Sequence, residues 1–100
     1  MFRKSWVKPG RLVPPSAKRL RSRSIRLAPG QEMPWHSTDR REELLVMLEG
    51  VVDLERRMSI ASRTLRVSLR AGHCAYLPSG TPHRLVNRSR RRARYLYVTA

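Results

Sequence analysis

Two histidines and one glutamate, His36, Glu43 and His83, are the side chains of this sequence best suited to forming a chemical site. Imidazole nitrogens and a carboxylate oxygen are good ligands for Fe(II), Mn(II), Ni(II), Zn(II) and Cu(II). Three protein ligands would leave positions on such an ion open for water or substrate, as Lewis-acid chemistry requires. Without a metal, the same three groups would hydrogen-bond to one another or to a polar ligand, so both alternatives stay open.

Two further side chains that could react or bind a metal ion, His73 and Cys74, are adjacent in the sequence. His73 follows Gly72, and this position favours a surface or hairpin role over coordination. Cys74 is the only cysteine, which excludes an intrachain disulfide and a cysteine-based zinc site. We expect this thiol to be a small core residue.

The elements that must position these groups are predicted to be strands. Glu43 and His83 each begin an extended stretch and can therefore point into one barrel, while His36 is expected in a loop beneath a neighbouring strand. Polar and apolar residues alternate strictly over residues 63–70, which predicts a strand with one solvent-exposed face and one apolar face. Further strands are expected at residues 22–27, 43–48, 51–54, 74–77, 83–87 and 93–99, and together they predict an all-β sandwich or barrel.

Length limits the chain to one small domain. With 100 residues, it can bury only a modest core, so a homodimer is expected. Residues 1–21 are basic and contain three prolines without a sustained period, which predicts an N-terminal arm before a domain at residues 22–100. No apolar run typical of a signal peptide or membrane span follows the N-terminus, so we expect a cytoplasmic protein that does not enter membranes.

The net charge of +15 is unevenly distributed, because all seven acidic residues lie between Glu32 and Glu55. Such basic flanks could bind phosphate or nucleic acid. The dense basic turn formed by the arginines at 88, 90–92 and 94 lacks the interleaved aromatic residues of a single-strand-binding surface. We therefore interpret the charge mainly as a solvated exterior, with nucleic acid as the less favoured partner.

Two spaced patterns frame the candidate residues. The second, Gly72-x5-Pro78-x-Gly80-x2-His83-x3-Asn87, resembles the second motif of the cupin superfamily at all five positions. The first, Gly30-x5-His36-x-Thr38-x4-Glu43-x6-Gly50, resembles the first cupin motif at four of its five positions, with Thr38 where the family usually has a second histidine. The resemblance covers residues 22–99.

The resemblance implies a small antiparallel β-barrel, the double-stranded β-helix or jelly roll of a single-domain cupin. It also implies a divalent-metal site reduced to His36, Glu43 and His83. Thr38 is expected to hydrogen-bond to a metal-bound water, because a threonine hydroxyl is a weak ligand. Met47 and Asn87 share the alternation of Glu43 and His83, respectively, and are candidate pocket residues for substrate binding. Trp35 could stack on a substrate ring or pack against a partner chain.

Three functions follow from this interpretation. The first is a metal-dependent enzyme acting on a small soluble metabolite, such as an isomerase, epimerase or dioxygenase. The second is a non-catalytic module that holds a sugar or other small molecule, with or without metal. The third, less favoured, is a protein that uses its cationic exterior to bind nucleic acid or an acidic partner.

Overall fold

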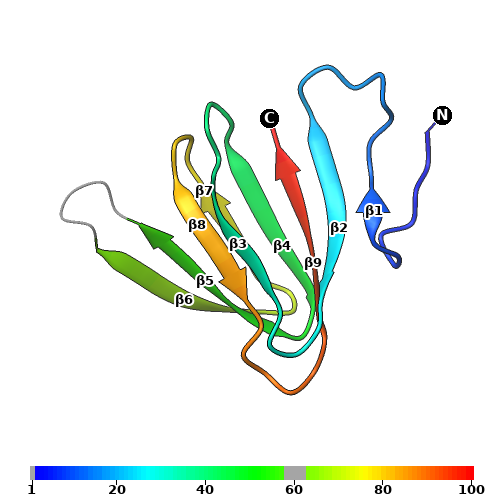
Figure 1. The fold of residues 1–100 in the computed structure, drawn as a ribbon. Coiled ribbons are helices and arrows are strands. Elements are labelled where there is room, and N and C mark those ends of the chain that lie inside the picture. The colour runs from blue at the N-terminus through cyan, green and yellow to red at the C-terminus, as the bar shows by residue number, and fades with distance from the viewer. Residues whose placement is uncertain (1, 58–62) are drawn as a thin grey trace.

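The computed structural model describes residues 2–57 and 63–100, which form two antiparallel sheets lying face to face (Figure 1). Residues 58–62, which the sequence analysis assigns to the barrel, lie outside this description. None of the described elements is a helix that could cross a membrane. The strands are β1 (Gly10–Arg11), β2 (Arg21–Leu27), β3 (Glu32–Ser37), β4 (Glu43–Glu49), β5 (Val51–Arg57), β6 (Thr64–Arg70), β7 (Cys74–Leu77), β8 (Pro82–Val86) and β9 (Ala93–Thr99).

The strand order confirms the predicted all-β jelly roll. One sheet has the order β1-β2-β9-β4-β7 and the other β3-β8-β5-β6, so chain neighbours such as β3 and β4 lie in different sheets. The core fills the space between the sheets with inward-facing apolar side chains of both. Its most buried members include Leu27, Leu45, Met47, Leu54, Leu77, Leu85 and Tyr95.

His36 lies in a strand, so its predicted place in a loop is wrong. Strand β3 runs along the edge of its sheet, and its pairing with β8 shifts register between Met33 and His36. Pro34 sits within that irregular stretch. Because proline lacks an N–H group and is tolerated in edge strands and bulges, the strand continues past it and sets His36 opposite His83.

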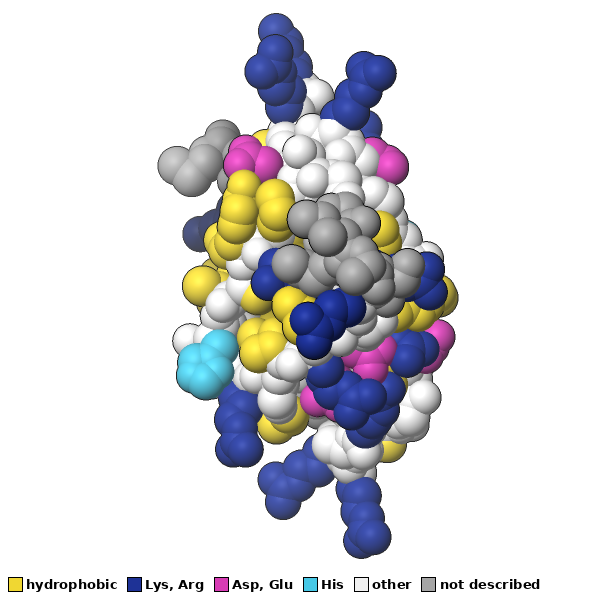
Figure 2. Space-filling model, turned by 90° about the vertical axis from the view of Figure 1, so that its left-hand side faces the viewer, with side chains coloured by type: hydrophobic (Ala, Val, Ile, Leu, Met, Phe, Trp, Pro, Cys, Tyr) yellow, Lys and Arg dark blue, Asp and Glu magenta, His cyan; other side chains and the backbone are white. Residues whose placement is uncertain are grey.

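The apolar face predicted for residues 63–70 is only partly buried. Leu69 is in the core, but Leu65 and Val67 are exposed because β6 is an edge strand. Cys74 is exposed as well, which corrects its predicted core position: it begins the opposite edge strand, β7. Figure 2 shows hydrophobic side chains gathered on the side of the molecule that carries β6.

The N-terminal arm is attached to the outer part of the larger sheet. Strand β1 pairs with β2, and Leu12 N donates a hydrogen bond to Ser22 O. Ser24 Oγ donates to Trp6 O, and the Arg94 guanidinium donates to Val7 O. These bonds lay the arm along β2 and bury the serine side of that strand.

The turn between β4 and β5 requires glycine at position 50. Its φ is +78°, and a Cβ added there would lie 2.7 Å from Arg92 O and 3.0 Å from Ala93 Cα. Gly50→Ala should therefore lower the free energy of unfolding by about 2–4 kcal/mol, combining backbone strain with a clash against backbone atoms. Urea denaturation measures this loss.

Gly30→Ala is the matched control for the clash. Gly30 has φ +81°, but an added Cβ would meet nothing within 4 Å. This variant should lose only about 1 kcal/mol, from the left-handed backbone alone. Equal losses in the two variants would show that the approach of residues 92–93 to Gly50 is not what requires glycine.

Candidate metal centre

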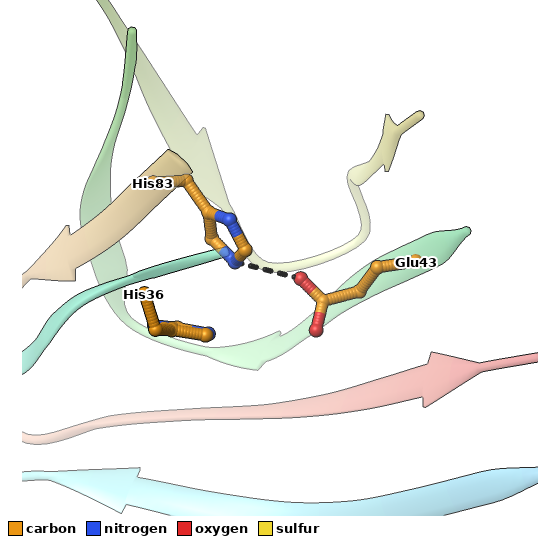
Figure 3. Close-up of side chains that lie close together, drawn as sticks. All are labelled: His36, Glu43 and His83. Atoms are coloured by element: carbon orange, nitrogen blue, oxygen red, sulfur yellow. Dashed lines mark ion pairs between the residues drawn. The ribbon is translucent and has the colours of Figure 1, made fainter. Parts of the chain in front are cut away.

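Three side chains from different strands meet between the sheets (Figure 3). His36 comes from β3, Glu43 begins β4, and His83 comes from β8. One ligand atom of each lies within 4.8 Å of the others, and the two imidazole ring centres are 4.2 Å apart. His83 is fully buried and Glu43 is 7% exposed, whereas His36 is exposed. The pairing of His36 with His83 across β3 and β8 produces this convergence.

Backbone carbonyls determine which nitrogen of each imidazole carries hydrogen. His36 Nδ1 lies 2.7 Å from Pro34 O, and His83 Nδ1 lies 2.8 Å from Thr81 O. Because a carbonyl oxygen can only accept a hydrogen bond, each Nδ1 must be the donor. In the neutral rings this leaves Nε2 with a free lone pair, which is the state that binds a metal ion.

His83 and Glu43 contact each other at the inner end of the site. His83 Nε2 is 2.9 Å from Glu43 Oε2, and neither atom has another hydrogen-bond partner in the described part of the chain. Burial acts to lower the pKa of His83, but the hydrogen bonds with Glu43 and with Thr81 O outweigh it. The pKa of His83 is therefore raised above its ordinary value.

Thr38 lines the cavity, but its hydroxyl has structural partners. Oγ1 donates to Pro78 O and accepts from Thr81 N, both at 2.9 Å. Since the hydroxyl proton is already used, a water bound here could donate to Thr38 but not accept from it. The same bonds hold the turn whose Thr81 carbonyl orients His83, so Thr38 supports the site indirectly.

A cavity of about 630 Å³ opens from the three-residue cluster. Part of its lining is apolar and aromatic, formed by Ile25, Met33, Leu45, Leu85, Tyr95 and Tyr97. Burial raises the pKa of Tyr95, so its hydroxyl stays protonated at neutral pH. The lining also includes four arginines, Arg21, Arg23, Arg40 and Arg41.

None of these arginines is among the site residues predicted from the sequence. The predicted arm ends at residue 21, and the cations were expected on the solvated exterior. A signal was available in β2, because Arg21 and Arg23 occupy the same alternation positions as Ile25 and Leu27. Positions that share a face with core residues point toward the interior.

Three other predicted pocket residues do not line this cavity. Met47 is packed in the hydrophobic core. Asn87 is fully buried, and its amide nitrogen donates to Leu27 O and Arg91 O while its oxygen accepts from Ser89. Trp35 is on the other face of β3 from His36, where its ring lies 5.0 Å from the Arg57 guanidinium and 5.3 Å from that of Arg84.

Comparison with known proteins agrees with this architecture. The cupin domain family profile matches residues 23–99. No curated protein matches the chain. Among solved structures, the protein TT1209 from Thermus thermophilus is 27% identical with a TM-score of 0.76, and the alignment covers 93% of this chain and 83% of that protein.

Two more distant structures share the fold. An oxalate oxidase is 21% identical with a TM-score of 0.75, over 80% of this chain and 41% of that one, so this chain spans about two fifths of its length. The cupin domain of CENP-C from Drosophila melanogaster is 15% identical with a TM-score of 0.75, over 89% of this chain and 65% of that one. At these identities the likeness concerns the fold alone.

The contact between Glu43 and His83 predicts how stability depends on pH in the metal-free protein. Because the pKa of His83 is raised on folding, the ion pair contributes fully below the unfolded value of about 6.5 and is lost as pH rises through the folded value. The free energy of unfolding should thus decline across this window. Urea titrations with a chelator between about pH 5.5 and 8.5 measure it.

Glu43→Gln is the control for this pH dependence. It keeps the shape of the side chain but removes the charge, so the imidazolium loses its ionic partner and only the hydrogen bond to Thr81 O still opposes the effect of burial on the pKa of His83. The decline with rising pH should disappear or reverse. Wild-type stability that is constant or increasing over the window would contradict the assignment.

Proposed function

Because the chain belongs to the cupin family, we propose that it binds one divalent transition-metal ion through His36, Glu43 and His83 and uses it to bind or transform a small soluble metabolite. The observation that carries the proposal is the donor set itself. Two imidazoles whose Nδ1 atoms are committed to carbonyls and one buried carboxylate meet at the inner end of a cavity of about 630 Å³.

The residues fit such an ion in number and chemistry. Two nitrogens and one oxygen suit Mn, Fe, Ni, Zn or Cu, and the otherwise unpartnered Glu43 Oε2 and His83 Nε2 are the atoms a metal would satisfy. Ligand atoms of a tetrahedral ion at about 2.1 Å lie about 3.4 Å apart. The spread of up to 4.8 Å therefore requires only a small inward movement, for which the exposed His36 has room.

Each residue has a defined part in this scheme. A bound ion would supply Lewis acidity and open positions toward the cavity. The carbonyls of Pro34 and Thr81 keep the ligand rings in the correct tautomer, and Thr38 holds the turn that carries Thr81. The aromatic wall of Tyr95 and Tyr97 excludes water from one side of a bound molecule.

A metal-free binding module is the second candidate. Its specific support is the direct contact of 2.9 Å between His83 and Glu43, which satisfies both groups without an ion when His83 is protonated.

Nucleic acid is a weaker candidate than either, because Arg66, Arg84, Arg88, Arg92 and Arg94 are paired with carboxylates. The exposed free thiol of Cys74 suits the reducing cytoplasm that we propose as the location.

Metal binding is tested by removing single ligands. Wild-type protein should bind about one Mn²⁺ or Zn²⁺ per chain, measured by calorimetry and elemental analysis, and His83→Ala should weaken binding by at least about 100-fold. His73→Ala is the matched control, because His73 lies outside the cluster. Affinity should increase as pH rises through the raised pKa of His83, since the metal must displace that proton.

Two results would contradict the metal site. Equal affinity in His83→Ala and in wild type would show that the ion binds elsewhere. Wild-type protein that takes up neither ion, even above the pKa of His83, would leave the metal-free module as the better account.

We also propose that the chain forms a homodimer. A groove of about 370 Å³ lies between the edge strands β6 and β7, and its lining includes the exposed Leu65, Val67 and Tyr76. A core this small gains from covering such a surface. Sedimentation equilibrium should give a dimer that Leu65→Lys with Val67→Lys converts to monomer, whereas a monomeric wild type at tens of micromolar would contradict it.

A further inference from the structure

Strand β2 directs two arginines toward the cavity instead of toward solvent alone. Along β2, Ser22 and Ser24 are buried on the side covered by the arm, while Ile25 and Leu27 face the interior. Arg21 and Arg23 have the alternation of these apolar residues, and both line the cavity. Both arginines are exposed, unlike Leu27 on the same face, so they line the open part of the cavity and are not members of the buried core.

The sheet register sets these arginines in line with the metal cluster. Arg21 pairs with Thr99 of β9, and Thr99 pairs with Glu43 of β4. Neighbouring strands lie about 4.8 Å apart, so the backbone of Arg21 is about 10 Å from that of Glu43 along one row. Arg23 lies in the next row, opposite Tyr97 of β9, which in turn lies opposite Leu45 of β4. Both of these residues line the cavity.

The charge of these arginines is not balanced by the protein. Within residues 2–57 and 63–100, neither Arg21 nor Arg23 forms an ion pair, although other arginines hold Glu32, Glu49, Asp53 and Glu55. All seven acidic residues of the chain lie within the described ranges, so no acid outside them could pair with Arg21 or Arg23.

The loop side of the cavity adds further positive charge. Arg40 and Arg41 line it with one carboxylate, Asp39, between them and β3. The Arg41 guanidinium is held by the carbonyl of Arg19, just before β2. The mouth therefore carries more cations than anions, and unpaired guanidinium groups in a concave site attract and orient anions.

We propose that the cavity takes a small anionic metabolite whose carboxylate or phosphate group is bound by Arg21 and Arg23. The other end of that molecule carries an oxygen that reaches the His36, Glu43 and His83 cluster, and this second contact rests on the proposed metal function. A short carbon backbone lies between the two ends, against Tyr95 and Tyr97. The arginine contact itself requires no metal.

Calorimetry on the full chain tests the proposal with two acidic probes, succinate and glycerol 3-phosphate, and with glycerol as the uncharged reference. Measurements are made on chelator-treated protein and on protein loaded with Mn²⁺. Arg21→Gln with Arg23→Gln should weaken binding of the acidic probe by at least tenfold, since charge-assisted bonds from both guanidinium groups are lost. Comparison of the two probes distinguishes a carboxylate ligand from a phosphate ligand.

Arg26→Gln with Arg90→Gln is the charge-matched control. Arg26 lies on β2 at the opposite alternation, Arg90 lies in the turn before β9, and neither lines the cavity. This control removes the same net charge and should change affinity less than twofold. Thermal melts of both double variants verify that each remains folded.

The outcomes separate this proposal from the metal proposal. Loss of acid binding in the Arg21 and Arg23 variant supports it, even in a protein that takes up no metal. Normal Mn²⁺ binding with acid affinity unchanged in that variant overturns it and leaves the metal site intact. Wild-type protein that binds neither acidic probe at about 10 mM also overturns it.

Discussion

A carboxylate and an imidazole face each other in the interior, with Glu43 Oε2 2.9 Å from His83 Nε2, and neither of these two atoms has another hydrogen-bond partner in the described chain. Burying such groups is costly unless each is paired with a charge, a hydrogen bond or a metal ion. The surrounding structure is arranged around that requirement. Thr81 O accepts a hydrogen bond from Nδ1 of His83, on the ring edge away from Glu43. Thr38 bonds to the turn that carries Thr81, and β8 begins directly after this turn.

The jelly roll brings these groups together because it places the consecutive strands β3 and β4 in different sheets. Glu43 belongs to the larger sheet, while His36 and His83 belong to adjacent strands of the smaller one. The site therefore bridges the two sheets at one end of the core. Side chains that lie far apart in the sequence meet there, with a register shift in β3 between Met33 and His36 and a positive φ of 53° at Asp39 in the loop that leads to Glu43.

Charge is divided between two surfaces of the molecule. On the outer face of the smaller sheet, Glu55 is nearly buried beneath Arg66, Arg84 and Arg88, and the hydrogen bond from Arg84 is the main reason that its pKa is lowered. Around the cavity, Arg21, Arg23, Arg40 and Arg41 form no ion pair with a carboxylate within residues 2–57 and 63–100. The high net charge thus includes a structural portion that the protein neutralises and a portion at the cavity that it leaves free.

The sequence alone determined the all-β fold, the cupin family and the set of groups that converge, because turn residues, alternation and motif spacing are local properties of the chain. Alternation also shows which residues share a face of a strand. Only the tertiary structure decided whether that face is covered: edge positions expose Val67 and Cys74, and the opposite face of β3 carries Trp35 away from the cavity. The direction of Arg21 into the cavity likewise depended on where β2 joins its sheet. Burial depends on which strands lie beside and across from a residue, and many of these neighbours, such as β9 beside β2 and β4, are distant in sequence.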